Sequence, residues 1–205
     1  MAAHGALIRR EPAVAAFTAV HVVVMAVLGS VWGRSFTWIY VPLLVASIAA
    51  VVIIDGRVGG LPRSDLWLLS IWALAHMSGG LLGDPSGQKE ILYNWWLVDG
   101  VLKFDQVVHG YGIAVATVTL VHAAERGRSA HPLRTGVLWA QAIGLGNEVV
   151  ENVFAAIVET ANVGDAINTA WDMAYHVIGG AVAVVILVRS RPERLRPRPA
   201  PPPAA

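Results

Sequence analysis

The chain has 205 residues, of which 56% are hydrophobic and only 14% charged, and its formal net charge is +1. The mean hydropathy of +0.58 exceeds that of a typical soluble domain of this size, so we expect an integral membrane protein. The absence of cysteine excludes disulfides, thiolate metal sites and cysteine nucleophiles. The basic residues form no stripe that would suit nucleic acid, so no nucleic-acid partner is expected.

Six apolar segments are each long enough to cross a bilayer, which takes about 20 residues. They lie at residues 13–32, 36–55, 65–82, 104–124, 135–160 and 169–189. We therefore expect an all-α fold, a bundle of six transmembrane helices formed by residues 1–188. Residues 189–205 are rich in Arg and Pro and cannot build a core, so they are expected to be a disordered cytoplasmic tail.

The positions of Arg and Lys orient this bundle, because short cytoplasmic loops collect positive charge. Twelve of the 15 basic residues fall on one side of the six predicted helices. The other side has only Arg34, Lys89 and Lys103. Both termini are therefore expected in the cytoplasm.

The connection from Gly83 to Lys103 is the longest one between predicted helices. It contains Tyr93, Trp95 and Trp96, and aromatic residues favour the headgroup level of a membrane. We expect it to lie along the outer interface.

Two of the apolar segments contain the same polar pair, Asp105-x-x-x-His109 and Asp172-x-x-x-His176. Residues four apart lie on one face of a helix, so the two side chains of each pair are neighbours. Ionisable groups in a transmembrane segment mark function by default. Each pair could also be structural, with the Asp accepting a hydrogen bond from its own His.

Other ionisable residues fall at the same depth as these two pairs. The segment 135–160 contains Glu148 and Glu151, and the segment 65–82 contains His76. At about 1.5 Å per residue, all of them and both pairs lie in the outer half of their helices. Unrelated polar residues would scatter between the two leaflets, so we expect a single site.

A divalent metal is the first chemistry that such a set of residues suggests, because zinc, iron and manganese bind imidazole and carboxylate. The candidate ligands are Asp105, His109, Asp172, His176, His76 and Glu148. Glu148 or Glu151 is the candidate general base. Glu148 continues the stripe of Gln141 and Gly144 and is expected to be the more deeply buried of the two carboxylates.

The expected depth of the site, near the headgroups, favours a metal-dependent membrane enzyme acting on a lipid or lipid-linked substrate. Two alternatives remain open at this point. The same carboxylates and imidazoles could relay protons or ions in a small coupled transporter. They could also stabilise a structural or accessory membrane protein through buried hydrogen bonds. The substrate, the identity of the metal and the oligomeric state do not follow from the sequence.

Four short motifs occur in order between residues 65 and 185: His76-Met-Ser-Gly-Gly80, Phe104-Asp105-x-x-x-His109, Glu148-Val-Val-Glu151 and Trp171-Asp172-Met173. This pattern resembles the YjdF-like family of bacterial inner-membrane proteins and, more loosely, VanZ-like proteins. The resemblance implies a multi-pass protein of the bacterial cytoplasmic membrane. It implies no particular reaction.

Overall fold

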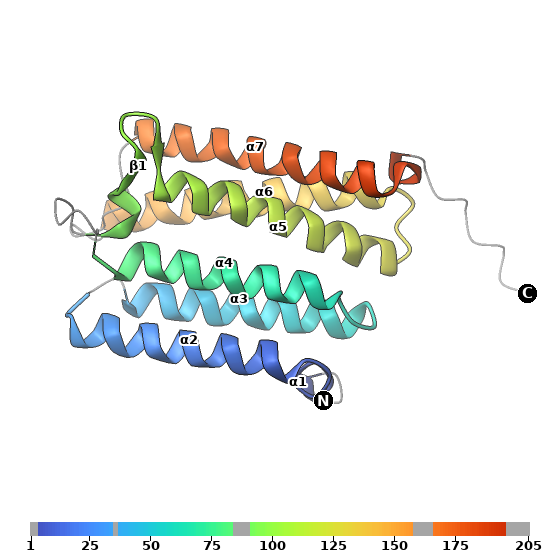
Figure 1. Cartoon of the computed structure of the whole chain (residues 1–205), viewed down its shortest axis with the longest axis horizontal. Helices are drawn as coiled ribbons and strands as arrows, with labels where there is room; N and C mark the ends of the chain where they lie inside the picture. Colours follow the sequence, from blue (N-terminus) through green and yellow to red (C-terminus); the bar gives the residue numbers. More distant parts are fainter. Residues whose placement is uncertain (1–3, 35–36, 84–90, 158–165, 196–205) are drawn as a thin grey trace, which may run out of the picture.

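The computed structural model describes residues 4–34, 37–83, 91–157 and 166–195, and in these ranges the chain is almost entirely helical. Six long helices run alongside one another in two groups of three (Figure 1). The first group contains α2 (Pro12–Val31), α3 (Thr37–Arg57) and α4 (Arg63–Leu81), and the second contains α5 (Phe104–Arg126), α6 (Pro132–Ile157) and α7 (Ala166–Ser190). A short helix, α1 (His4–Arg10), precedes them.

Each predicted apolar segment coincides with one of the six long helices. Four of these, α2, α3, α5 and α7, are long and apolar enough to cross a membrane. Helices α4 and α6 have 19 and 26 residues and are therefore also long, but their polar side chains lower their hydropathy. The chain is thus a membrane protein with several candidate spans.

The outer faces of the helices are apolar, as lipid contact requires. Trp38 on α3, Trp139 on α6 and Ile157 at the end of α6 are each more than 60% exposed. By contrast, Met77, Leu81 and Val121 are completely buried between the helices. The membrane-embedded helices therefore contact lipid through their outward-facing side chains.

The connection between α4 and α5 contains more structure than the predicted interfacial loop. A 3-10 turn, η1 (Leu92–Asn94), leads into β1 (Trp96–Val98), which pairs antiparallel with β2 (Leu102–Lys103). Gly100 adopts φ 64° in the hairpin turn, a conformation that glycine tolerates without strain. Tyr93 was expected at the interface but is buried against α4, because its hydroxyl bonds to His76.

Ion pairs fasten the opposite end of the bundle. They join Arg10 Nη2 to Asp55 Oδ1 at 2.6 Å, His122 Nδ1 to Asp65 Oδ2 at 2.7 Å, and Arg194 Nε to Glu125 Oε1 at 2.6 Å. Arg194, in the last of these pairs, belongs to the predicted tail, which begins at residue 189. Helix α7 continues to Ser190, and a 3-10 turn, η2 (Pro192–Leu195), brings Arg194 back onto α5. Residues 196–205 lie outside the described ranges.

Candidate metal centre

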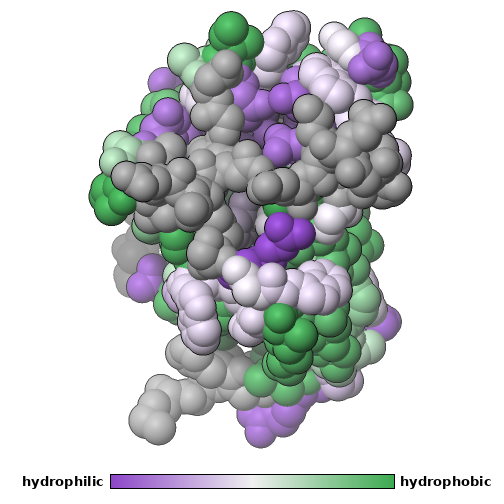
Figure 2. Space-filling model, turned by 90° about the vertical axis from the view of Figure 1, so that its left-hand side faces the viewer, coloured by the Kyte–Doolittle hydropathy of each residue, from purple (hydrophilic) through white to green (hydrophobic). Residues whose placement is uncertain are grey.

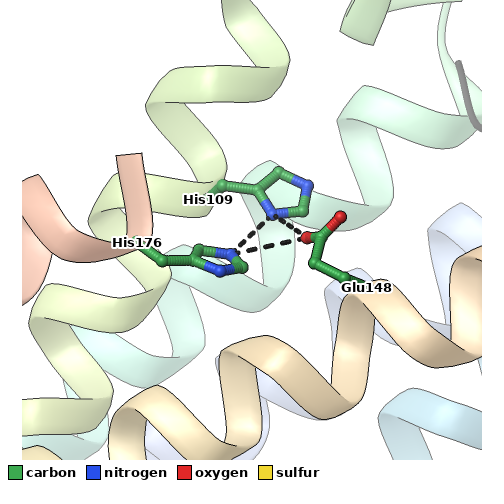
Figure 3. Close-up of side chains that lie close together, drawn as sticks. All are labelled: His109, Glu148 and His176. Atoms are coloured by element: carbon green, nitrogen blue, oxygen red, sulfur yellow. Dashed lines mark hydrogen bonds and ion pairs between the residues drawn. The ribbon is translucent and has the colours of Figure 1, made fainter. Parts of the chain in front are cut away.

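Three buried side chains from three different helices meet near the hairpin end of the bundle. His109 lies on α5, Glu148 on α6 and His176 on α7 (Figure 3). His109 Nδ1 is 2.9 Å from His176 Nε2 and 3.3 Å from Glu148 Oε1, and the third side of this triangle, from His176 Nε2 to Glu148 Oε1, is 3.7 Å. All three residues are at least 93% buried.

These separations match those between ligands of one metal ion. A triangle with sides of 2.9, 3.3 and 3.7 Å has a circumscribed circle of radius about 1.9 Å, close to the bond lengths of about 2.0–2.2 Å from Zn²⁺ to His nitrogen or carboxylate oxygen. His109 Nδ1, His176 Nε2 and Glu148 Oε1 would therefore be the three atoms that hold an ion, and a bound ion would supply Lewis-acid chemistry there.

A hydrogen bond between the two imidazoles would also account for the separation of 2.9 Å, but it leaves the carboxylate unexplained. Among the described residues, oxygen Oε1 of Glu148 accepts no hydrogen bond, and its nearest nitrogens are His109 Nδ1 at 3.3 Å and His176 Nε2 at 3.7 Å. A buried carboxylate needs a positive charge beside it in a medium of low polarity. A metal cation bound to the three atoms supplies this charge, whereas a hydrogen bond between two neutral imidazoles does not.

Asp105 orients the first histidine without entering the triangle. Its Oδ1 lies 3.2 Å from His109 Nε2, the ring nitrogen that faces away from Glu148. A carboxylate on the second nitrogen of a histidine fixes the tautomer, so the proton stays on Nε2 and the lone pair of Nδ1 is free to bind a metal. Asn168 Nδ2 in turn donates to Asp105 Oδ2 at 3.1 Å.

Asp172 differs from the pairing that its spacing suggested. It does not bond to His176, one turn along α7, but accepts a hydrogen bond from Asn168 Nδ2 at 2.7 Å. Its other oxygen, Oδ1, is buried and has no hydrogen-bond partner among the residues that the structure describes. Asp172 nevertheless belongs to a second convergent group, because one of its oxygens lies within 4.8 Å of ligand atoms of both Asp105 and His109.

His76 is the candidate ligand that the fold does not bring to either group. Its ring stacks on Trp72, with centroids 5.2 Å apart, and its Nδ1 lies 2.5 Å from the Tyr93 hydroxyl. Burial raises the pKa of the Tyr93 phenol, which therefore stays protonated and also donates to the His76 carbonyl at 2.9 Å. His76 thus anchors the hairpin connection to α4.

The two glutamates differ in burial, and Glu148 is the buried one, 3% exposed. Glu151 lies one turn farther along α6 and is partly exposed, and Asn147 Nδ2 donates to its Oε1 at 2.7 Å. On the other side of the site, Gln141 Nε2 donates to the His176 carbonyl at 3.2 Å. The expected stripe of Gln141, Gly144 and Glu148 therefore does face α7.

Glycines allow the close approach that the site needs. A Cβ at Gly179 would collide with the backbone of Gly110, so these two glycines let α5 and α7 touch. A Cβ at Gly144 would meet the imidazole of His176.

Sequence reasoning did not single out Asn168. The available signal was its spacing of four residues from Asp172.

Comparison with known proteins identifies one family. The family described as "Predicted membrane protein (DUF2238)" matches residues 13–193, which include the six long helices. No curated protein and no solved structure matches the chain.

Proposed function

The chain belongs to the DUF2238 family of predicted membrane proteins, and we propose that it is a metal-dependent membrane enzyme acting on a lipid or lipid-linked substrate. The observation that carries the proposal is the triangle of His109, Glu148 and His176, whose dimensions suit one divalent ion. Two imidazoles and one carboxylate favour zinc, iron or manganese.

A bound ion with an open position would polarise a substrate oxygen and activate a water molecule. In this proposal Glu148 is a ligand, so the role of general base passes to Glu151. Glu151 lies one turn from Glu148 and is partly exposed, which suits a group that must exchange protons. Asn147 orients its carboxylate through the bond to Oε1.

The position of the site in the bundle supports a lipid as substrate. His109 lies in the first half of α5 and His176 in the first half of α7. The hairpin, which directly precedes α5, lies at the same end of the bundle. Figure 2 shows hydrophilic residues gathered on this end face, with hydrophobic ones along the sides. Lys103 belongs to this end and lies over the Trp96 ring at 5.0 Å, so a cation is available near the headgroup level.

The proposal includes six membrane spans, a bacterial inner-membrane location and cytoplasmic termini. The six long helices, which run alongside one another in Figure 1, support this count. The resemblance to YjdF-like proteins supports the location. The basic residues at the end opposite the hairpin, such as Arg10, Arg126 and Arg194, support the orientation.

Ion or proton translocation is the second candidate, and buried polar groups outside the site favour it. His21 on α2 is 6% exposed, and neither ring nitrogen has a hydrogen-bond partner among the described residues. The buried Asp65 with His122 adds a second polar group near the opposite end. A transporter would use these groups as steps of a path, whereas an enzyme would not need them.

Two matched substitutions on α6 test the enzyme's metal centre. Glu148→Gln keeps the shape of the side chain but removes the charged ligand, so bound metal should fall from one ion per chain or more to well below one. Glu151→Gln removes an equal charge one turn away and should leave metal binding unchanged. The measurement is elemental analysis of detergent-purified protein after incubation with Zn²⁺ and removal of free metal.

The melting temperature of both variants, recorded without metal, checks that each remains folded. Added Zn²⁺ should raise the melting temperature of the wild type and of Glu151→Gln, because a ligand that binds only the folded state stabilises it. A wild-type protein without stoichiometric metal and without any thermal shift would rule out the metal centre and leave translocation as the better account.

A further inference from the structure

We propose that a second divalent cation binds beside the first, held by the carboxylates of Asp105 and Asp172. This inference deepens the proposed function and rests on it, because His109 lies between the two sites. Its Nδ1 faces Glu148 and its Nε2 faces Asp105. The centre would then hold two ions on the two sides of one imidazole.

The fold holds the two carboxylates together although they come from different helices. Asn168 donates to Oδ2 of Asp105 at 3.1 Å and to Oδ2 of Asp172 at 2.7 Å, so one amide group bridges them. One oxygen of each residue and one ring nitrogen of His109 lie within 4.8 Å of one another. Two negative charges so close together repel each other unless a positive charge or a proton lies between them.

Independent support comes from the oxygen that has no partner. Asp172 is only 1% exposed, and its Oδ1 accepts no hydrogen bond from any described residue. Burying a charged oxygen without a partner is strongly unfavourable, and carboxylates that are buried in this way pair with cations or bind metals. Asn168 Nδ2 already donates to Oδ2 of Asp172, so Oδ1 is the oxygen that can bind a cation.

Lysine and arginine supply no positive charge to this pair: among the described residues, neither Asp105 nor Asp172 forms an ion pair with Lys or Arg. Lys103 Nζ lies 3.4 Å from Asn168 Oδ1 and so contacts the bridging amide instead of a carboxylate. The basic group beside the pair is His109, whose Nε2 lies 3.2 Å from Asp105 Oδ1. With His109 neutral, as a ligand of the first ion, the Asp pair retains charge that a second ion would balance.

The two sites should differ in the metals they prefer. The triangle offers two nitrogens and one oxygen, which suit zinc and other transition metals. The Asp pair offers only oxygens, and oxygen ligands suit Mg²⁺, Ca²⁺ and Mn²⁺. Mn²⁺ binds both kinds of ligand, so it is the ion that should fill both sites.

The test counts Mn²⁺ bound to the purified full-length protein in detergent. The wild type should bind two ions per chain, and Asp172→Asn should bind one. Asn at position 172 has nearly the shape of Asp and can still accept the bond from Asn168. Electron paramagnetic resonance gives a second readout, because two neighbouring Mn²⁺ ions couple magnetically and the coupled signal should disappear in Asp172→Asn.

The possible results separate this inference from the proposed function. No Mn²⁺ and no Zn²⁺ in the wild type would overturn the proposed function itself. One Mn²⁺ per wild-type chain, without a coupled signal, would overturn the second site alone. An infrared band of a protonated carboxylic acid that persists in the Mn²⁺-saturated wild type and vanishes in Asp172→Asn would also overturn it, because Asp172 would then carry a proton in place of the ion.

Discussion

Both ring nitrogens of His109 have partners, and this distinguishes it from His176, the other histidine of the site. Nδ1 belongs to the triangle with Glu148 and His176, while Nε2 bonds to Asp105. His176 has no such support within the described part of the chain, because its Nδ1 is buried there without a hydrogen-bond partner. Asp105 therefore fixes the orientation and tautomer of His109, whereas the orientation of His176 depends on packing.

We predict that Asp105→Asn weakens Zn²⁺ binding at the triangle by about 10- to 100-fold, the usual cost of losing an orienting carboxylate. Zn²⁺ titration of the purified protein measures the change. Asp65→Asn is the matched control, because Asp65 forms the same kind of pair with His122 on the opposite end of the bundle. Equal Zn²⁺ affinity in both variants and the wild type would contradict the orienting role of Asp105.

Helical spacing predicted part of this arrangement. The interval of four residues correctly paired Asp105 with His109 and placed Glu148 on the buried face. The same interval was misleading for Asp172, because Asn168 lies one turn before it and competes for its carboxylate. Spacing within one helix cannot reveal such competition, nor the contact between His109 and His176, which depends on how α5 and α7 pack.

At the scale of helices, α6 positions the ring of His176 by leaving space for it. Gly144 lies beside that ring, and any Cβ there would collide with His176 Nδ1 and with Ile113. At Gly146, two residues along the same helix and exposed, no atom of the described residues lies within 4 Å of the corresponding position. The two glycines thus differ in burial and in what a side chain there would meet.

We predict that Gly144→Ala weakens Zn²⁺ binding by about tenfold or more, because the displaced imidazole leaves its productive position. Gly146→Ala should keep the affinity and raise the melting temperature slightly, since Ala in a helix is favoured over Gly by about 1 kcal/mol. Zn²⁺ titration and thermal unfolding measure both effects. Unchanged affinity in Gly144→Ala would show that His176 has freedom to move.

The helices themselves were predictable, whereas the hairpin was not. Apolar runs located all six long helices because each is long enough to give a strong signal. Strands β1 and β2 have three and two residues, too few for a periodic pattern. The burial of Tyr93 depends on its bond to His76 and on the space at Gly79, and both are tertiary contacts.

At the scale of the whole molecule, the ion pairs of arginine with carboxylates and the candidate site occupy opposite ends. The ion pairs of Arg10 with Asp55 and Arg194 with Glu125 belong to one end. The hairpin and the two convergent ligand groups belong to the other. This polarity is what the positive-inside rule predicts for a cytoplasmic end and an outer end.

The absence of cysteine makes the orientation easy to test. We predict that Asp99→Cys, at the exposed hairpin, reacts with a membrane-impermeant maleimide in intact cells, because the hairpin faces outward in the proposed topology. His131→Cys, exposed between α5 and α6, should react only after the membrane is permeabilised. Labelling in the reverse order would place the termini outside and would contradict the proposed topology.

The order of the helices along the chain has a consequence for how the protein is made. The three residues of the triangle come from α5, α6 and α7, and Arg194 fastens the end of α7 to Glu125 only after the last helix is in place. The ribosome delivers these helices in that order, so a partly synthesised chain lacks His176 and cannot assemble the triangle. In the proposed six-span topology, completion of the proposed centre would therefore be a late event of membrane insertion, after the first five long helices have been synthesised.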